Sequence, residues 1–483
     1  TINDQKWGGL WRYWAGFLED QWKLSARLTL TYGVRWEYTR PRTERWNRQS
    51  VLDLRTLQLR FAGENGAPRT LFDGDHNNFA PRIGLAYAPF GDARTSIRAA
   101  FGVYYIPISI IGSAGEFTRG FTVSRTFQSL DGGITFPLTL QTAFPVVTLT
   151  REVSALDTAS TIGPSYANPS LNQWTLSIQR ELVARTLVEA TYIGTKGTHL
   201  QVASRNLNQV PTALLGPGNA QSRRPYPGNG NINYPYQPIA NSIFHGVQLK
   251  VEHRFSSGLN LLGWYGLQKS MDNSSGMKDI RTVGTVVIQD NYNMAAERSI
   301  STFDRTHTGL ITGLYELPFG RGKKFATSGP AGVLLGGWQI NGILTLRGGV
   351  PLSMLTAQNL TGSLGGGSRP DRLRSGRLAG SEQSIKRWFD VTAFQAPPQF
   401  RFGNDSRTQP DLRGPGAAQL DFSIFRNFRF GEKLNVQIRG EAFNALNHTN
   451  FAVPNTSIGS AAAGTITSSD SARSLQLGAR LYF

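Results

Sequence analysis

Segments in which apolar and polar residues alternate recur along the whole chain of 483 residues. In the segment 338–347, Trp338 and Ile340 share one face, whereas Gln339 and Arg347 lie on the opposite face. A period of two indicates β-strands with one apolar and one polar face. Charged residues on the polar face argue against a β-sandwich core, because buried unpaired charges are costly. They favour a wide barrel whose lumen holds water or a plug.

We expect about thirteen such strands, each long enough to cross a membrane in a tilted barrel. The predicted strands are 11–23, 27–39, 81–89, 95–106, 171–182, 186–196, 244–255, 258–269, 305–317, 336–348, 419–429, 432–444 and 472–483. Short links between strands alternate with long ones along the chain. The one exception is the link 318–335, which is longer than the other links expected to be short. Short periplasmic turns and long extracellular loops are typical of outer-membrane barrels. The predicted fold is therefore all-β, a transmembrane antiparallel β-barrel.

The composition agrees with a barrel. Hydrophobic residues make up 39% of the chain, and no apolar run approaches the about 18 to 20 residues that a membrane helix needs, which excludes a helical membrane protein. The absence of cysteine excludes disulfide scaffolds and thiolate metal sites. The net charge of +18 comes from basic residues scattered over loops and strand ends, without a nucleic-acid-binding motif. We therefore expect solvated loops, or loops facing anionic lipopolysaccharide, and no nucleic-acid partner.

The last strand carries a spacing that resembles the C-terminal assembly signal of bacterial outer-membrane barrels. Its polar-x-Gly-x-x-apolar-x-Phe pattern is matched by Gln476, Gly478, Leu481 and Phe483. The match predicts recognition by the barrel-assembly machinery and residence in the bacterial outer membrane. An ordinary edge strand is the alternative. Because even-stranded barrels begin and end at the periplasmic rim, counting thirteen strands back predicts at least one further strand upstream.

The histidines do not form a recognisable catalytic or metal-binding pattern. His245 and His253 share a strand face but would lie about 26 Å apart, too far for one ion. His307 follows Asp304 closely, and no Gly-x-Ser-x-Gly nucleophile motif accompanies it, so we interpret this pair as part of a hydrogen-bonded structural corner. We predict no catalytic residue, no metal and no cofactor.

Three loop segments remain as candidate sites. The segment 73–77 lacks the full ligand series of a calcium loop, and 320–324 lacks the Ser or Thr of a phosphate loop, so both are interpreted as turns. The segment 223–238 interleaves aromatic rings and amides, which suit sugars or peptides, with prolines. An exposed loop stiffened by proline is the alternative. The candidate ligand-binding residues are Tyr226, Asn229, Asn231, Tyr234 and Tyr236.

Stretches spread over nearly the whole chain resemble the TonB-dependent receptors, and among them the Oar-like group with an N-terminal carboxypeptidase-regulatory-like domain. They include 17–23, 27–38, 78–84, 173–182, 303–307, 317–322 and 441–448. The resemblance implies a 22-stranded barrel filled by a plug and energised through TonB. Residues 1–483 would be the C-terminal part of that barrel, about thirteen strands, without the plug and the N-terminal domain. The TonB complex is therefore an expected partner of the full-length protein only.

The expected function is TonB-dependent uptake of a bulky ligand, such as a siderophore, a glycan or a peptide, by an outer-membrane receptor without enzymatic activity. A passive outer-membrane pore or a surface adhesin is the alternative, and a plug sequence upstream would distinguish these functions. A barrel hydrolase would need a serine and a histidine paired on one lipid-facing strand, and the sequence indicates no such pair.

Overall fold

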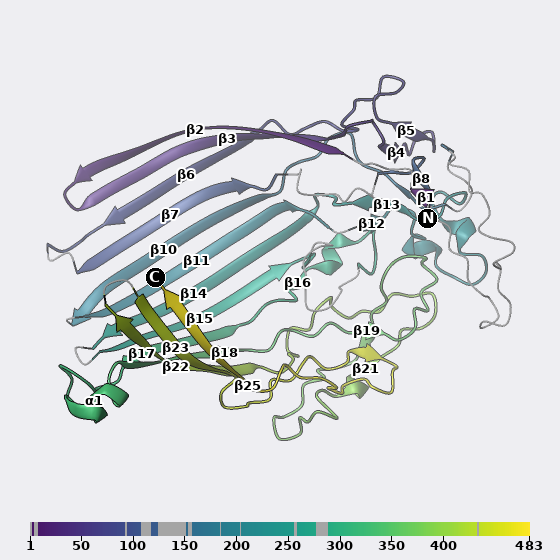
Figure 1. Ribbon diagram of the computed structural model, residues 1–483. Helices are drawn as coiled ribbons and strands as arrows, with labels where there is room; N and C mark the ends of the chain where they lie inside the picture. Colours follow the sequence, from purple (N-terminus) through teal and green to yellow (C-terminus); the bar gives the residue numbers. More distant parts are fainter. Residues whose placement is uncertain are drawn as a thin grey trace.

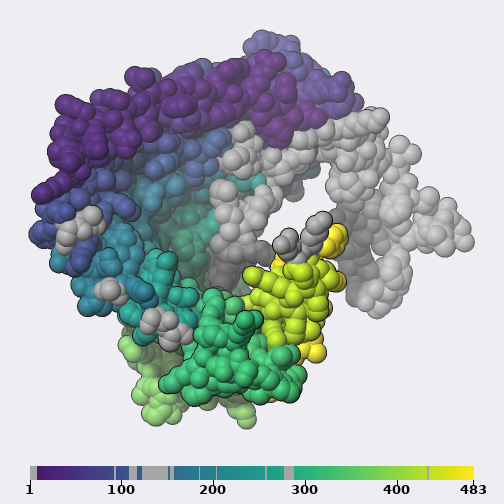
Figure 2. All heavy atoms as spheres, turned by 60° about the vertical axis from the view of Figure 1, so that its left-hand side comes forward, coloured from purple at the N-terminus to yellow at the C-terminus, as the bar shows by residue number. Residues whose placement is uncertain are grey.

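The computed structural model describes residues 2–3, 8–91, 94–107, 117–123, 151–152, 157–183, 185–202, 204–255, 258–276, 288–431 and 434–483. Its dominant feature is one antiparallel sheet of long strands, which we call the wall (Figure 1). The wall curves around a central hollow, which is visible from its short-turn end in Figure 2.

The wall contains thirteen long strands in chain order. They are β2 (Gly9–Ser25), β3 (Leu28–Glu44), β6 (Asn78–Tyr87), β7 (Thr95–Tyr105), β10 (Ser170–Val183), β11 (Thr186–Leu200), β14 (Ala240–Arg254), β15 (Leu259–Asp272), β17 (His307–Glu316), β18 (Trp338–Arg347), β22 (Ala417–Phe430), β23 (Leu434–Phe443) and β25 (Ser474–Tyr482). Each pairs antiparallel with the next, and the short β16 (Ser299–Ile300) adds to β15. All thirteen predicted strands are confirmed.

The register keeps the apolar residues of neighbouring strands on one face of the wall. Leu477 lies opposite Gly440 on the adjacent strand, and Gly440 lies opposite Ile424 on the next. The Leu477 side chain is 89% exposed, so no other part of the chain covers it. The opposite face is polar, with Gln476 facing Glu441. In a membrane barrel the apolar face contacts lipid and the polar face lines the lumen.

The two ends of the wall differ in their connections. Five links at one end are short turns, and the sixth, between β17 and β18, contains helix α1 (Gly329–Leu335). The long connections all lie at the opposite end (Figure 1). The predicted arrangement of short periplasmic turns and long extracellular loops is confirmed. The link 318–335, which we expect to be longer than the other turns, contains helix α1.

The long connections pack into a layer that we call the loop cap, which comprises the described residues of 45–77, 106–169, 201–239, 273–306, 348–416 and 444–473. Its short strands are β4 (Ser50–Leu52), β5 (Leu59–Phe61), β8 (Thr122–Val123), β9 (Ala159–Ser160), β12 (Ser204–Asn206), β13 (Ile232–Pro235), β19 (Leu355–Thr356), β20 (Asp371–Arg372), β21 (Phe394–Gln395) and β24 (Ser457–Ile458). Strand β1 (Ile2–Asn3) pairs with β8. The 3-10 helices are η2 (Thr212–Leu214), η3 (Gln221–Arg223), η4 (Met294–Glu297) and η5 (Val391–Ala393).

Three apolar clusters lie in the loop cap, and they hold most of the buried apolar side chains described. The first is built around Phe389 and Met354, the second around Val51 and Phe117, and the third around Leu52, Ala159 and Ile232. The hydrophobic core of this chain is therefore in its loops and not in its sheet.

The wall is open as far as it is described. Its pairing path ends at β2 and at β25, and no pairing joins these two strands within the described ranges. In the same ranges, no helix has both the length and the apolar character needed to span a membrane.

Candidate functional site in the loop cap

Three ion pairs join two long loops of the cap, and the carboxylate of each pair is buried. Three arginines of the β18–β22 loop each pair with a carboxylate from the end of β15 or the loop that follows it. The pairs are Arg369–Glu297, Arg407–Asp272 and Arg413–Asp304. The Arg407 and Asp272 side chains are only 2% and 3% exposed. Because each buried charge would be costly without its partner, the pairs hold the two loops in one arrangement.

Arg407 is the most embedded of these arginines. Besides Asp272, it donates to the Glu297 carbonyl over 2.8 Å and to the Ser275 hydroxyl over 2.5 Å. Burial lowers the pKa of Arg407, and the charge of Asp272 opposes this shift. Arg407 therefore depends on its carboxylate partner to remain a buried cation.

The predicted ligand-binding residues do not all reach the surface. Asn229, Tyr234 and Tyr236 are buried. The Tyr234 hydroxyl accepts the Gly163 N–H over 2.9 Å, and burial raises the pKa of Tyr234. The Tyr236 carbonyl accepts a hydrogen bond from the Tyr166 hydroxyl. In the structure these three residues hold the segment in place within the cap.

The other two predicted residues belong to an accessible cluster. Tyr226 is half-buried against the Leu52–Ala159–Ile232 cluster, and Asn231 is exposed. The Asn231 side-chain carbonyl accepts from Asn206 Nδ2 and from Arg224 Nη2, each over 3.1 Å. We call Asn206, Arg224, Tyr226, Asn231 and Tyr292 the tyrosine patch.

Tyr292 comes to the patch from a different loop. Its ring is exposed, and its hydroxyl donates to the Gln209 carbonyl over 2.7 Å. Partial burial is the main cause that raises the pKa of Tyr292. The Tyr292 side chain also lies close enough to Arg224 and Tyr226 for electrostatic interaction. The phenol therefore remains neutral at physiological pH. The patch presents aromatic faces and amides, groups that bind sugars, peptides and other polar ligands, whereas its Arg224 guanidinium is buried.

Buried amides form the scaffold beneath the tyrosine patch. Asn208 accepts the Tyr226 N–H over 2.9 Å and donates to the Gly230 carbonyl over 2.7 Å. Gln209 Oε1 accepts the backbone N–H of Asn291 over 3.1 Å, and the Asn291 side chain donates to it as well. These bonds connect the two loops that supply the patch, so its geometry is formed before any ligand arrives.

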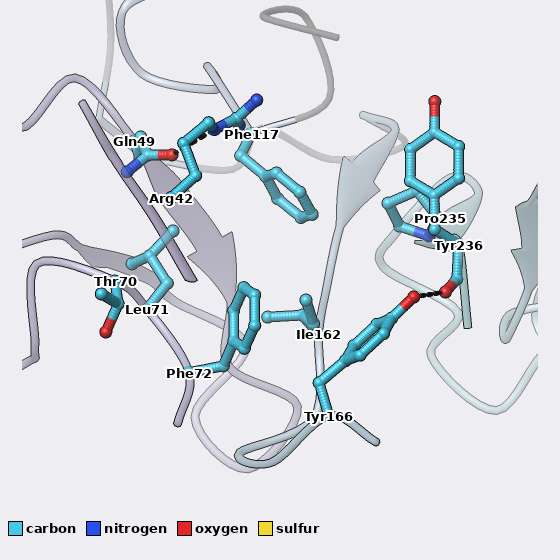
Figure 3. A pocket seen from close by; sticks show the side chains of 10 residues that line it. All are labelled: Arg42, Gln49, Thr70, Leu71, Phe72, Phe117, Ile162, Tyr166, Pro235 and Tyr236. Atoms are coloured by element: carbon cyan, nitrogen blue, oxygen red, sulfur yellow. Dashed lines mark hydrogen bonds between the residues drawn. The ribbon is translucent and has the colours of Figure 1, made fainter. Parts of the chain in front are cut away.

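A small cavity lies elsewhere in the cap, between the loop-cap end of β3 and the loops that carry Phe72, Phe117 and Tyr166 (Figure 3). Its volume is about 30 Å³, comparable to the space of one water molecule. The Tyr166 hydroxyl at its edge donates to the Tyr236 carbonyl (Figure 3). A siderophore, sugar or peptide does not fit, so this cavity is a packing void of the cap.

The histidines have separate structural partners. The His307 ring bonds the Tyr265 hydroxyl over 2.7 Å, and Asp304 accepts the Ser270 N–H over 2.7 Å in addition to Arg413. The predicted hydrogen-bonded corner is confirmed. Its hydrogen bonds are made by the Asp304 carboxylate, whereas the His307 ring bonds only the Tyr265 hydroxyl among the bonds described. No group of three or more potential metal ligands occurs in the part of the chain that is described.

His245 and His253 each bond a neighbour on β11. His245 bonds the Tyr192 hydroxyl over 2.9 Å, and His253 bonds the Thr186 hydroxyl over 2.5 Å. The two histidines therefore have different partners, as expected from their predicted separation along one strand.

Of the two segments that we interpret as turns, 320–324 is a turn in the structure, whereas 73–77 is irregular and Asp73 forms a parallel bridge with Ser165. In 73–77, the Asp75 carboxylate accepts the N–H groups of Asn77 and Asn168. In 320–324, the Lys323 N–H donates to the Gly320 carbonyl over 3.0 Å. The prediction of a turn is therefore confirmed for 320–324 and not for 73–77.

The residues of the predicted assembly signal lie on or beside the edge strand β25. The backbones of Gln476, Gly478 and Leu481 pair in register with β23. Phe483 follows the strand, and its side chain is fully exposed. This arrangement leaves one side of β25 without a partner in the described sheet. Recognition by an assembly machinery remains a prediction.

No motif in the sequence indicates the roles of Arg369, Arg407, Arg413, Asn206 and Tyr292 in the cap. The partners of Arg369 and Arg407 are 72 and 135 residues away, so no local spacing reveals the pairs.

Comparisons with known proteins agree with this geometry. The family model described as "Outer membrane beta barrel domain" matches residues 1–476. The outer membrane transporter YddB from Escherichia coli is similar in structure at 11% identity, with a TM-score of 0.53 over 97% of this chain and 45% of that chain. The ferric-catecholate import receptor Fiu from E. coli K12 gives 11% identity and a TM-score of 0.44 over 99% and 45% of the two chains.

The siderophore receptor PiuA from Acinetobacter baumannii gives 9% identity and a TM-score of 0.45 over 99% of this chain and 44% of that chain. The chain thus spans less than half the length of these three structures. No curated protein sequence matches it. The Oar-like subgroup remains a prediction. The family match, together with a wall that is apolar outside and polar inside, establishes that this chain belongs to the outer membrane beta-barrel domain family and resides in the bacterial outer membrane.

Proposed function

We propose that residues 1–483 form the C-terminal part of the barrel of a TonB-dependent receptor that takes up a bulky ligand. The observation that carries this proposal is the loop cap, whose loops are fixed to one another by buried ion pairs. A passive pore for small solutes has no evident need for such an ordered extracellular layer. A receptor benefits from it, because a preformed surface lowers the entropic cost of capturing a scarce ligand.

The open wall supports the assignment to part of a larger barrel. The unpaired backbone groups of β2 and β25 could not remain exposed to lipid, since each unsatisfied group costs several kcal/mol there. We infer that further strands complete the wall in the full-length protein. A 22-stranded barrel, which the family resemblance implies, would supply them together with a plug, and the full-length receptor would then engage TonB.

Within the cap, we assign ligand contact to the tyrosine patch. Tyr226 and Asn231 offer a ring and an amide at the surface, and Tyr292 adds a second ring. Asn229, Tyr234 and Tyr236 act indirectly, by holding the segment that carries the first two residues. Siderophores, glycans and peptides all suit this mixture of aromatic and amide groups.

An uptake assay tests the proposed function. Cells that express the full-length receptor would be given a labelled ferric siderophore, an oligosaccharide or a short peptide, in strains with and without TonB. We expect accumulation of one of these probes only when TonB is present. Equal accumulation in both strains would contradict active uptake and would favour the passive pore. Surface binding without accumulation would favour the adhesin.

Two variants test the tyrosine patch in the same cells. Tyr226→Ala and Asn231→Ala should each weaken binding of the accumulated probe by roughly tenfold, which corresponds to about 1.4 kcal/mol. Leu214→Ala, at an exposed apolar residue of the cap outside the patch, is the matched control. Unchanged affinity in both patch variants would place the ligand site elsewhere in the cap or in the lumen.

The remaining partners are proposals of the same kind. The exposed Phe483 and the open edge of β25 suit docking to the barrel-assembly machinery. Basic residues of the extracellular loops suit contact with lipopolysaccharide. Removal of Phe483 should lower the amount of folded protein in the outer membrane without changing its total synthesis.

A further inference from the structure

Helix α1 exposes large apolar side chains at the periplasmic end of the wall. Val333, Leu334 and Leu335 are 68%, 69% and 50% exposed. Three consecutive apolar residues in such a position indicate an interaction surface, because contiguous exposed apolar groups are uncommon on surfaces that face only water.

The contacts of α1 place it beside the lipid-facing side of the wall. The Leu334 carbonyl accepts from Trp338 Nε1 over 3.0 Å and from Arg426 Nη1 over 2.9 Å. Trp338 and Arg426 lie opposite each other in the register, on the same face as Ile340 and Ile424. The C-terminal end of α1 therefore continues the apolar outer face at its periplasmic rim (Figure 1).

The link that carries α1 is folded back on itself. The Gly320 N–H donates to the Phe325 carbonyl over 2.9 Å, and Phe325 donates back to the Pro318 carbonyl over 2.9 Å. A Cβ atom on Gly320 would lie 2.7 Å from Gly336 Cα, so the two ends of the link touch. Hence α1 is held at the rim by its own link as well as by the wall.

The same link carries only positive charge. Arg321, Lys323 and Lys324 are exposed, and no acidic residue occurs between 317 and 337. Lys323 pairs with Glu316 over 2.7 Å at the end of β17, which leaves Arg321 and Lys324 as excess cations. Phospholipid phosphates carry the complementary charge, and clustered basic residues beside an apolar surface are typical of segments that lie in a membrane interface.

We propose that α1 and the basic turn 321–324 form an interfacial lipid anchor in the periplasmic leaflet of the outer membrane. Val333, Leu334 and Leu335 enter the boundary between headgroups and acyl chains, and Arg321 and Lys324 bind phosphate. The ligand is a phospholipid surface, and its preferred headgroup is anionic. This anchor is independent of the uptake function, and it would fix the depth of the barrel on one side of its circumference.

Site-specific fluorescence tests the anchor, because the chain has no cysteine of its own. Leu334→Cys, labelled with an environment-sensitive dye, would be compared with Leu214→Cys in the loop cap, which is also exposed and apolar. Both variants are made in the full-length receptor, in which further strands complete the wall, and are reconstituted in phosphatidylcholine vesicles that contain spin-labelled lipids, which quench the dye on contact. We expect quenching several-fold stronger at 334 than at 214. Equal quenching at the two positions would overturn the anchor and would point to a periplasmic protein as the partner.

The contribution of charge is tested with a second set of vesicles that contain phosphatidylglycerol. Quenching at 334 should increase in these vesicles, and the combined variant Arg321→Gln and Lys324→Gln should lose this increase. Retention of the increase in the variant would overturn the assignment of phosphate binding to the basic turn. Heat-modifiable electrophoretic mobility provides the check that both chains are folded.

Discussion

The wall and the loop cap of this protein bury opposite kinds of groups. The wall turns its leucines outward, as with Leu477, and keeps its charges on the lumen side, as with Glu441. The cap has Phe389 at the centre of an apolar cluster and keeps the Arg407–Asp272 pair away from water. The wall is thus organised for a lipid solvent, whereas the cap resembles a small soluble domain distributed over several loops.

This difference predicts how each region loses stability. The wall depends on its ladder of backbone hydrogen bonds, which the truncation of a single apolar side chain hardly affects. The cap depends on packing and on paired charges, so single substitutions should open it locally while the wall stays intact. Hydrogen exchange read peptide by peptide can measure the two regions separately in one sample.

The largest expected effect is the loss of a cap core residue. Phe389→Ala should destabilise the cap by about 3–5 kcal/mol, because Phe389 is fully buried and its removal leaves a cavity. The reduction in exchange protection of peptides 352–412 measures this loss. Leu477→Ala in the wall is the matched control and should change protection little, since lipid fills the space that the leucine leaves. Similar losses at both sites would remove the distinction between the two regions.

A comparable effect is expected from breaking a buried ion pair. Arg407→Met should cost the cap about 3–5 kcal/mol, because Asp272 is left buried without a partner. Exchange protection of both connected loops should fall together. The double variant Arg407→Met and Asp272→Leu should recover much of the loss. A double variant as unstable as the single one would show that the pair contributes through other contacts, such as those to Ser275.

A charge placed on the wall tests its polarity. Leu249→Arg, on the lipid face of β14, should destabilise the barrel by about 2–4 kcal/mol, whereas its neighbour Gln248→Arg, on the lumen face, should have little effect. Urea unfolding in vesicles, followed by heat-modifiable mobility, measures both variants. The reverse order of the two effects would mean that we have assigned the faces incorrectly.

The smallest expected effect concerns pH. Burial raises the pKa of Asp405, against hydrogen bonds from Gln409 and from the Ser406 N–H. Because the folded value lies above the ordinary 3.8, this group stabilises the cap most below 3.8, and the contribution is lost as pH rises through the folded value. Asp405→Asn should abolish this part of the pH dependence of cap exchange. An unchanged pH profile would exclude Asp405 as its source.

The wall was predictable because lipid imposes a strict period of two. Two predicted strands are too short at their extracellular ends, where this constraint no longer applies. The strand predicted over 27–39 continues to Glu44, and the strand predicted over 244–255 already begins at Ala240. At these extracellular ends, alternation no longer distinguishes the two faces, although the backbone ladder continues.

The candidate site was predictable only in part. The aromatic and amide composition of 223–238 correctly drew attention to a segment at the centre of the cap, but composition cannot tell the buried Tyr234 from the more accessible Tyr226. That distinction depends on β9 and β12, which pair with β13 from distant parts of the chain. Likewise, nothing near Tyr292 in the sequence indicates that it joins this segment.

The three arginine–carboxylate pairs also limit how this protein can change. All three arginines lie on the β18–β22 loop, and all three acids lie at or after the end of β15. A graft of either loop alone from a related barrel would leave buried ions without partners. Diversification of the extracellular surface, by evolution or by engineering, should therefore exchange these two loops as one unit, whereas the β23–β25 loop can vary without breaking these pairs.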